Sequence, residues 1–459
     1  MKFTSAVCTH ILILWNVWTL VTCGKTPSGL YHDDGKGHTI LTQRFSKKDV
    51  REISFDILNI MGFNHRPHPH LVDSRSPASQ FLMEVYNSLS NEVDVDLSNG
   101  VNGRKQSWRT SSSPNITWSQ FNVDQDEANT IAQADEIISF INRGHKFSDR
   151  LQPHAEDKQF WFDTSEIPST ELVFGAELRL WKKTLARNLK DDYDYNEADD
   201  DYQTDGKSQV VRISVKQVVP VKGANTLDLV ELDEIVVAKW EQGWLRLNVT
   251  SAFREWILRP ESNLGLVIST KCAETGEEIE LEATGLTKAE EEDEHQPFVV
   301  AFLKGSESRR NIGSKPRKPG RRTIRSTKQK RNKKSKKGRQ YDFTETLDRP
   351  RSCQMGMLYV NFEDLGWKDW VIAPDGFIAY YCHGECSFPL TASMNATNHA
   401  IVSTLVHTYY PLEYPKPSCS PVKLGSISML YYDDNSNVTV KKYKDMVIKS
   451  CGYWGQESS

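Results

Sequence analysis

The placement of the cysteines constrains the fold of this chain more than any other feature. Five of the eight cysteines lie near its end, at Cys353, Cys382, Cys386, Cys419 and Cys451. In an oxidising compartment such a cluster predicts a disulfide framework. A zinc site is the alternative, but the Cys382–Cys386 spacing is not that of a tight zinc knuckle, and no second paired motif follows. We therefore expect disulfides, and no metal or other cofactor.

The start of the chain indicates secretion. Lys2 precedes an apolar stretch over 11–21, and the small-residue exit Thr22-Cys23-Gly24 follows, as in a secretory signal peptide. The stretch is too short for a membrane span, which needs about 20 apolar residues. A buried N-terminal helix is the alternative reading. We expect a signal peptide over 1–23 and an extracellular product, which places the cysteine cluster where disulfides persist.

Residues 24–303 are predicted to form a β-rich domain with helices near its start. Residues 49–62 carry apolar side chains at helical spacing, with Asp49 as a candidate cap and Gly62 as a stop. Further helices are expected over 80–89 and 249–258, and the clearest strands over 172–181, 210–215 and 298–303.

Two polar segments of this domain have competing interpretations. His65, His68 and His70 alternate with prolines, which gives no convergent geometry for a metal and favours a surface loop. The run over 191–205 holds many acids and no base, so it is expected to be a solvated loop between strands. Its interleaved tyrosines leave sulfation open.

Residues 304–339 form a basic linker with little apolar material to bury. Within it, Arg322-Thr-Ile-Arg325 suits an Arg-selective proprotein convertase, and 328–331 is a second candidate. The bases that follow predict binding of a polyanion, in a secreted protein heparan sulfate rather than nucleic acid. A solvated tail is the alternative. The predicted heparin-binding residues are Lys328, Lys330, Arg331, Lys333, Lys334, Lys336, Lys337 and Arg339.

Residues 340–459 are predicted to form two long β-hairpins and one crosswise helix. The first hairpin turns at 374–376, the helix runs from Asn395 to about Tyr409, and the second hairpin turns at 432–437. A domain this thin has little core, so we expect cystines and a partner subunit to supply stability.

Four motifs in this region carry a specific resemblance. They cover 358–370, 381–390, 395–402 and 441–447, beginning with Leu-Tyr-Val-x-Phe-x-Asp-Leu-Gly-Trp. The chain resembles the transforming growth factor β superfamily, in particular the bone morphogenetic protein branch that includes the osteogenic proteins and the insect ligand glass bottom boat. Upstream, 49–62, 81–87, 134–142 and 322–325 resemble the family prodomain and its processing site.

The resemblance implies a precursor whose prodomain assists folding and is cut away. The mature part would be residues 326–459, a cystine-knot growth factor with two β-hairpin fingers and a crosswise helix. It would act as a homo- or heterodimer that bridges type I and type II receptor serine/threonine kinases and so activates Smad proteins. We expect no enzyme activity, since no HExxH, P-loop or Gly-x-Ser-x-Gly motif is present.

The resemblance also implies receptor-binding residues. The type I site, or wrist, would comprise Trp367, Trp370, Phe388, Ile401, Val402 and Leu405, and the type II site, or knuckle, would comprise Ala373, Ser428, Leu430 and Val440. Exposed tryptophans and a half-used apolar helix face suit an interface hot spot. The alternative is that these side chains pack in a core, or, for the helix, on the partner subunit.

The cysteine pattern departs from the family. Seven framework cysteines are usual and this domain has five; Ser418 stands where the interchain cysteine belongs, and Tyr453 stands at the position of another. The family pairing implies Cys353–Cys419 and Cys382–Cys451, and leaves Cys386 alone. Losing a cystine typically costs about 2–5 kcal/mol.

Three readings of this departure are open. Cys386 forms an interchain bond, or the product is weakened or active only in heterodimers, or the C-terminus is a variant of an otherwise ordinary ligand. A non-signalling, heparan-binding decoy is the rival function. Separately, four sequons predict glycosylation, with Asn395 favoured by its family position: Asn115, Asn248, Asn395 and Asn437.

Overall fold

The computed structural model describes residues 26–33, 39–70, 75–93, 121, 123–144, 158–185, 210–221, 226–287, 295–305, 353–384, 397–414 and 416–454. These residues fall into two compact units, and each is described by itself. The first unit draws on 1–66, 348–427 and 444–459, and the second on 67–347 and 428–443.

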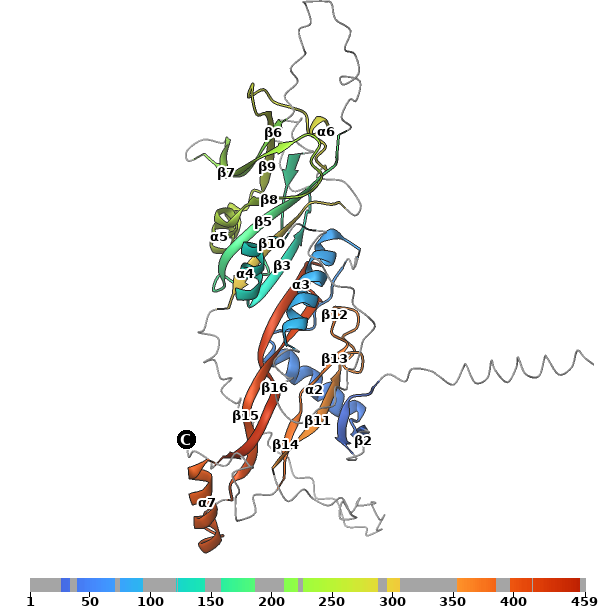
Figure 1. The fold of residues 1–459 in the computed structure, drawn as a ribbon, viewed down its shortest axis with the longest axis vertical. Helices are drawn as coiled ribbons and strands as arrows, with labels where there is room; N and C mark the ends of the chain where they lie inside the picture. The colour runs from blue at the N-terminus through green and yellow to red at the C-terminus, as the bar shows by residue number, and fades with distance from the viewer. Residues whose placement is uncertain are drawn as a thin grey trace, which may run out of the picture. The chain divides into compact units, whose positions relative to one another are not determined.

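The first unit contains an antiparallel sheet in the order β13-β11-β1-β2 (Figure 1). Its central strands come from opposite ends of the sequence, because Leu30 in β1 lies opposite Leu358 in β11. The strand β14 pairs with the start of β11. The bounds are β1 (Gly29–Asp33), β2 (Thr39–Arg44), β11 (Gln354–Asn361), β12 (Val371–Ala373), β13 (Gly376–Ile378) and β14 (Tyr381–His383).

The helix α2 (Lys47–Ile60) follows β2 and belongs to the same unit. Ser46, not Asp49, is its N-cap: the Ser46 hydroxyl accepts from the Asp49 amide at 3.3 Å, and the Asp49 carboxylate accepts from the Ser46 amide at 3.0 Å. This reciprocal pair is a capping box, so the helix begins earlier than predicted. Gly62 ends it with a φ of 86°, as the sequence predicted.

The predicted C-terminal helix and second hairpin are confirmed. The helix α7 (Asn398–Tyr409) is capped by Thr397, whose hydroxyl accepts from the Ala400 amide at 3.1 Å. The strands of this hairpin, β15 (Ser418–Tyr432) and β16 (Val438–Trp454), are longer than the sequence predicted. Each strand is divided between the two units: the second unit contains 428–443, and the first contains the outer parts of both strands.

The second unit has two antiparallel sheets. One runs β15-β16-β3-β10-β5-β8 and the other β4-β9-β6-β7. The strands predicted over 172–181, 210–215 and 298–303 are confirmed as β5, β6 and β10. The bounds are β3 (Glu136–Ile141), β4 (Gln159–Phe160), β5 (Leu172–Lys182), β6 (Val210–Pro220), β7 (Leu227–Ala238), β8 (Gly243–Asn248), β9 (Leu266–Cys272) and β10 (Phe298–Lys304).

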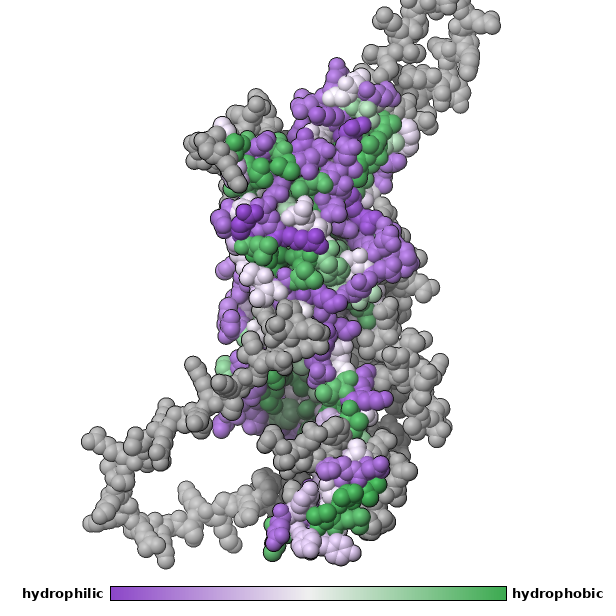
Figure 2. Space-filling model, turned by 90° about the vertical axis from the view of Figure 1, so that its left-hand side faces the viewer, coloured by the Kyte–Doolittle hydropathy of each residue, from purple (hydrophilic) through white to green (hydrophobic). Residues whose placement is uncertain are grey.

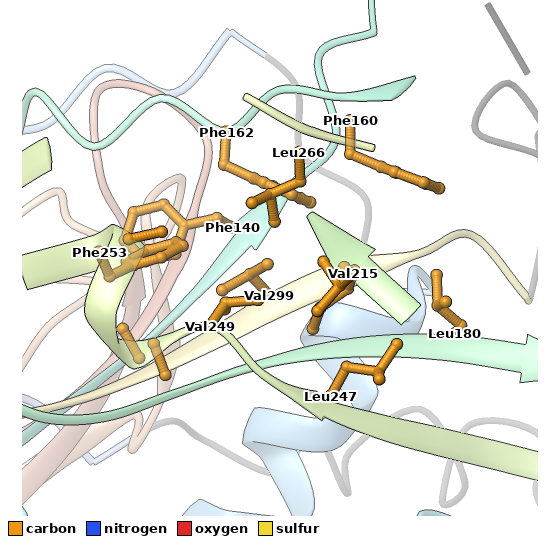
Figure 3. Packing of buried hydrophobic residues seen from close by; sticks show 14 of the residues in the cluster. Phe140, Phe160, Phe162, Leu180, Val215, Leu247, Val249, Phe253, Leu266 and Val299 are labelled. Atoms are coloured by element: carbon orange, nitrogen blue, oxygen red, sulfur yellow. The ribbon is translucent and has the colours of Figure 1, made fainter. Parts of the chain in front are cut away.

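One hydrophobic core joins the two sheets of the second unit (Figure 3). Phe140 and Val299 from one sheet, Val215 and Leu266 from the other, and Phe253 of the helix α5 all belong to it. Two sheets packed through their inner faces are a standard way to bury β-strands. The helices of this unit are α3 (Pro77–Val93), α4 (Gln125–Gln133), α5 (Thr250–Leu258), the 3-10 turn η4 (Pro260–Ser262) and α6 (Leu281–Thr284).

A buried ion cluster ties α4 to the sheet. The fully buried Arg179 pairs with Glu127, and it also donates to the carbonyl of Phe121 at 3.0 Å. Arg246 donates to the other Glu127 oxygen at 2.9 Å and also pairs with Asp124. Burial raises the pKa of Glu127 to about 7, although both arginines lower it. No helix within the described ranges is long and apolar enough to cross a membrane.

Candidate receptor-binding and assembly surfaces

The two disulfides expected from the family pairing are confirmed. Cys353 is bonded to Cys419 with a Cα–Cα distance of 5.3 Å, and Cys382 to Cys451 with 5.7 Å. They tie β11 and β14 to the long strands β15 and β16. Cys386, the fifth cysteine, lies outside the described residues. Ser418 is exposed, and its hydroxyl lies 3.0 Å from that of Ser420.

Tyr453 fills the position at which the family resemblance predicts a further cysteine. Its side chain is completely buried. The Tyr453 hydroxyl accepts a hydrogen bond from the Cys353 amide at 2.6 Å. The next residue toward the N-terminus, Gly452, has its carbonyl oxygen 3.6 Å from the Cys353 sulfur. A packed ring and a hydrogen bond therefore connect the end of β16 to the start of β11. The cystine that the resemblance implies at position 453 would instead have paired with Cys386.

The two predicted wrist tryptophans are brought together, but they are not exposed. Trp367 and Trp370 are 1% and 0% exposed, with ring centroids 5.2 Å apart. The Trp367 indole nitrogen donates to the Ser54 hydroxyl of α2 at 3.0 Å. The Phe63 ring, just after α2, meets Trp370 edge-on at 5.4 Å. The expectation of exposed tryptophans is therefore wrong for the full chain, because α2 and the segment after it cover them.

The helix part of the predicted wrist is open. Val402 is 56% and Leu405 38% exposed on α7, and Ile401 is partly exposed, whereas Ala400 is fully buried. Figure 1 labels α7, and Figure 2 shows green, apolar side chains at the bottom of the view, beside the polar ones. Phe388 lies outside the described residues. Leu405 is therefore not packed in the core of its own chain, which was the alternative interpretation.

The predicted knuckle residues divide into two pairs. Ala373 and Ser428 are partly exposed, whereas Leu430 and Val440 are 0% and 3% exposed. Val440 lies opposite Ile137, because β16 adds to the edge of β3 over 438–441. Backbone pairing at a sheet edge satisfies polar groups on both strands. In the full chain, prodomain strand β3 therefore holds this end of the second hairpin.

The turn between β15 and β16 has further partners in the second unit. The His68 amide donates to the Asp434 carboxylate at 2.7 Å, and the His70 amide to the Ser436 hydroxyl at 3.0 Å. Within the turn, the Asp433 carboxylate accepts from the Asn437 amide at 2.8 Å. Burial raises the pKa of Asp433 to about 7, opposed by hydrogen bonds from Asn437.

The histidine segment is a loop, as predicted, and no metal-ligating cluster is found among the residues that the structure describes.

The two described sequons differ in accessibility. Asn248, at the end of β8, is exposed, and its side-chain oxygen accepts from the Thr250 amide at 3.0 Å. Asn437 is 1% exposed, and its side-chain nitrogen donates to Asp433 at 3.0 Å. Outside the described residues lie Asn115, Asn395, the acidic run over 191–205, the processing residues Arg322 and Arg325, and the basic run over 328–339.

Comparison with known proteins identifies the class to which this fold belongs. The family model for the TGF-beta propeptide matches residues 34–302, and that for the transforming growth factor beta like domain matches residues 352–453. Together they cover most of the chain, which therefore belongs to the transforming growth factor β superfamily. The members of this family are signalling ligands rather than enzymes.

Relatives place the chain in the bone morphogenetic protein branch. It is 32% identical over 455 residues to Protein 60A of Drosophila melanogaster, covering 96% of this chain and 95% of that protein. It is 33% identical over 423 residues to Bone morphogenetic protein 8A of Homo sapiens, covering 89% and 91%.

Proposed function

We propose that this chain is the precursor of a secreted, dimeric ligand of the bone morphogenetic type, which bridges type I and type II receptor serine/threonine kinases and activates Smad proteins. Holding two kinases close together raises their effective concentration without any chemistry by the ligand. Cleavage after Arg325 would separate the prodomain from the mature part, 326–459, and the basic run over 328–339 would bind heparan sulfate.

The observation that best supports a regulated ligand is the cover over the wrist tryptophans. Two adjacent indoles, desolvated together, form the kind of aromatic anchor that dominates interface energies. In the full chain this anchor is already occupied by Ser54 and Phe63. A type I receptor therefore competes with α2, and release of α2 must precede or accompany receptor binding.

The open face of α7 supports a dimer. Val402 and Leu405 expose apolar surface, and Leu412, just beyond the helix, is 99% exposed. Because Ser418 replaces the expected interchain cysteine, packing rather than that covalent bond would hold the two subunits. The second subunit is either another copy of this chain or a related ligand.

The non-signalling decoy rests on the missing cysteines, and Tyr453 weakens that argument. Its burial and its hydrogen bond to Cys353 anchor the end of β16 without the absent cystine, which would have joined position 453 to Cys386. The comparisons also favour a growth factor of the ordinary kind over a decoy.

The test is Smad phosphorylation in responsive cells treated with convertase-processed, purified protein. Wild-type protein is expected to signal, whereas Arg322→Gln/Arg325→Gln/Lys328→Gln/Arg331→Gln, which removes both candidate sites, should not be cleaved and should signal weakly. Val402→Asp/Leu405→Asp should abolish signalling, with Val422→Asp/Leu424→Asp, two exposed apolar residues elsewhere in the mature part, as the matched control. No phosphorylation by the processed wild type, either alone or co-expressed with a related ligand, would reject the proposal.

A further inference from the structure

The first unit contains a cationic hollow at the junction of β2 and α2. Its volume is about 470 Å³, and it is lined by Ser28, Arg44, Phe45, Lys47, Val50, Arg51 and Asp364. This size falls in the range of small-ligand sites. Three of the seven lining residues are cations and one is an acid, so the hollow carries an excess of positive charge.

Chain geometry brings the three cations together. Lys47 and Arg51 are one helical turn apart on α2, and so lie on the same face. Arg44 is the last residue of β2, and only Phe45 and Ser46 separate it from α2. The Arg51 Nε donates to the Lys47 carbonyl at 3.3 Å, which orients the guanidinium and leaves its two terminal nitrogens for other partners.

The acids near the hollow have partners other than these three cations. The Asp364 carboxylate accepts from the Ser28 amide at 2.6 Å. Asp49 completes the capping box with Ser46. Glu52 points to Lys48, at 3.7 Å. In the described part of the chain, no ion pair neutralises Arg44, Lys47 or Arg51, and all three are exposed.

We propose that the hollow formed by Arg44, Lys47 and Arg51 binds a sulfated polysaccharide of the heparan sulfate class, through prodomain cations that are separate from the basic run of the mature part. Three neighbouring cations match the sulfate groups of such a chain, and arginine presents two of its donors in parallel to one oxyanion. Partly buried Phe45 and Val50 provide an apolar floor for the sugar rings.

A site in the prodomain has a distinct consequence. The cations all precede position 325, so cleavage there would leave them with the prodomain and the run over 328–339 with the ligand. Each part would then be retained on the extracellular matrix independently. This inference rests only on secretion of the chain, not on its signalling. Because the experiment measures heparin binding, a negative result can be told apart from a failure of the ligand to signal.

The experiment uses the full chain with every Lys and Arg over 309–339 changed to Gln, which removes the charge of the basic linker. Heparin affinity is measured at physiological ionic strength on an immobilised heparin surface. Arg44→Gln/Lys47→Gln/Arg51→Gln is expected to weaken binding about tenfold, from three exposed charge contacts. The matched control is Arg212→Gln/Arg259→Gln/Lys304→Gln, which removes the same charge from exposed positions of the prodomain and should have little effect.

Two further arms separate the outcomes. Arg44→Lys/Arg51→Lys keeps the charge but removes the paired guanidinium donors, so it should weaken binding, though less than the Gln variant does. Poly-glutamate of matched charge should compete poorly with heparin. If the hollow variant and the control variant weaken heparin binding equally, the loss of affinity follows net charge alone, and the proposal is overturned. Equal competition by poly-glutamate would reject a sulfated polysaccharide in favour of an acidic peptide.

Discussion

Tyr453 offers the sharpest test of how this domain folds with an incomplete cystine framework. Its ring is completely buried at the end of β16, and its hydroxyl is the acceptor for the Cys353 amide at 2.6 Å. Tyr453→Phe removes the acceptor and keeps the ring, whereas Tyr453→Ala removes both. The two variants therefore separate the hydrogen bond from the packing.

The magnitudes follow from burial. Losing one hydrogen bond to a partly buried amide costs about 1 kcal/mol, and truncating a buried aromatic side chain to Ala costs about 3–5 kcal/mol. The second value is comparable to the typical stabilisation by a cystine, about 2–5 kcal/mol. Packing by Tyr453 is therefore large enough to offset the stability lost with the missing cystine, although it does not tether Cys386.

Hydrogen exchange of the full chain, resolved by mass spectrometry of peptides, is the assay. Tyr453→Phe should accelerate exchange of the Cys353 amide about fivefold, with a smaller effect elsewhere. Tyr453→Ala should accelerate exchange throughout β11 and the end of β16 by about a hundredfold or more. Tyr409→Phe, which removes a hydroxyl from a side chain that is 78% exposed, is the control. Unchanged exchange in Tyr453→Ala would refute the reasoning.

Three other predictions concern the covered surfaces. Burial raises the pKa of Asp433 to about 7, so between about pH 4 and 7 the folded β15–β16 turn holds a proton that the unfolded turn releases. The stability of the turn should therefore fall as pH rises from about 4 to about 7 and then level off. Hydrogen exchange of the β16 amides should follow this pH dependence in the wild type and lose it in Asp433→Asn. Mass spectrometry of the secreted, folded precursor should find a glycan on Asn248 and none on Asn437; a glycan on Asn437 would contradict the buried amide. Phe63→Ala should loosen the cover over Trp370, so the processed complex should activate Smad at lower concentration than wild type, and an unchanged dose response would argue against the cover.

The framework of the growth factor domain was predictable because its signals are local or are carried by the resemblance. Apolar and polar residues alternate along the strands of the second hairpin, and Thr397 lies directly before an apolar helix face. Both disulfides follow the family pairing. In the prodomain, the sequence predicted Asp49 as the cap of α2, whereas Ser46 is the cap in the structure. Asp49 lies inside the first turn of the helix and completes the capping box with Ser46.

The state of the candidate sites was not predictable from local signals. Trp367 is bonded to Ser54, which lies 313 residues earlier, and the Tyr453 hydroxyl is bonded to Cys353, 100 residues earlier. Such contacts depend on tertiary packing of distant segments. Alternation alone showed that Val440 lies on one face of a strand, but not that β3 pairs with that strand.

The most direct test of the central claim measures binding of a type I receptor ectodomain to three preparations: the intact precursor, the cleaved complex with its prodomain, and the mature part after the prodomain has been removed. The covered tryptophans predict weak or no binding by the first, intermediate binding by the second, and strong binding by the third. Equal binding by the intact precursor and the stripped ligand would contradict cover by α2, and no binding by the stripped ligand would contradict the assignment of a receptor-bridging ligand.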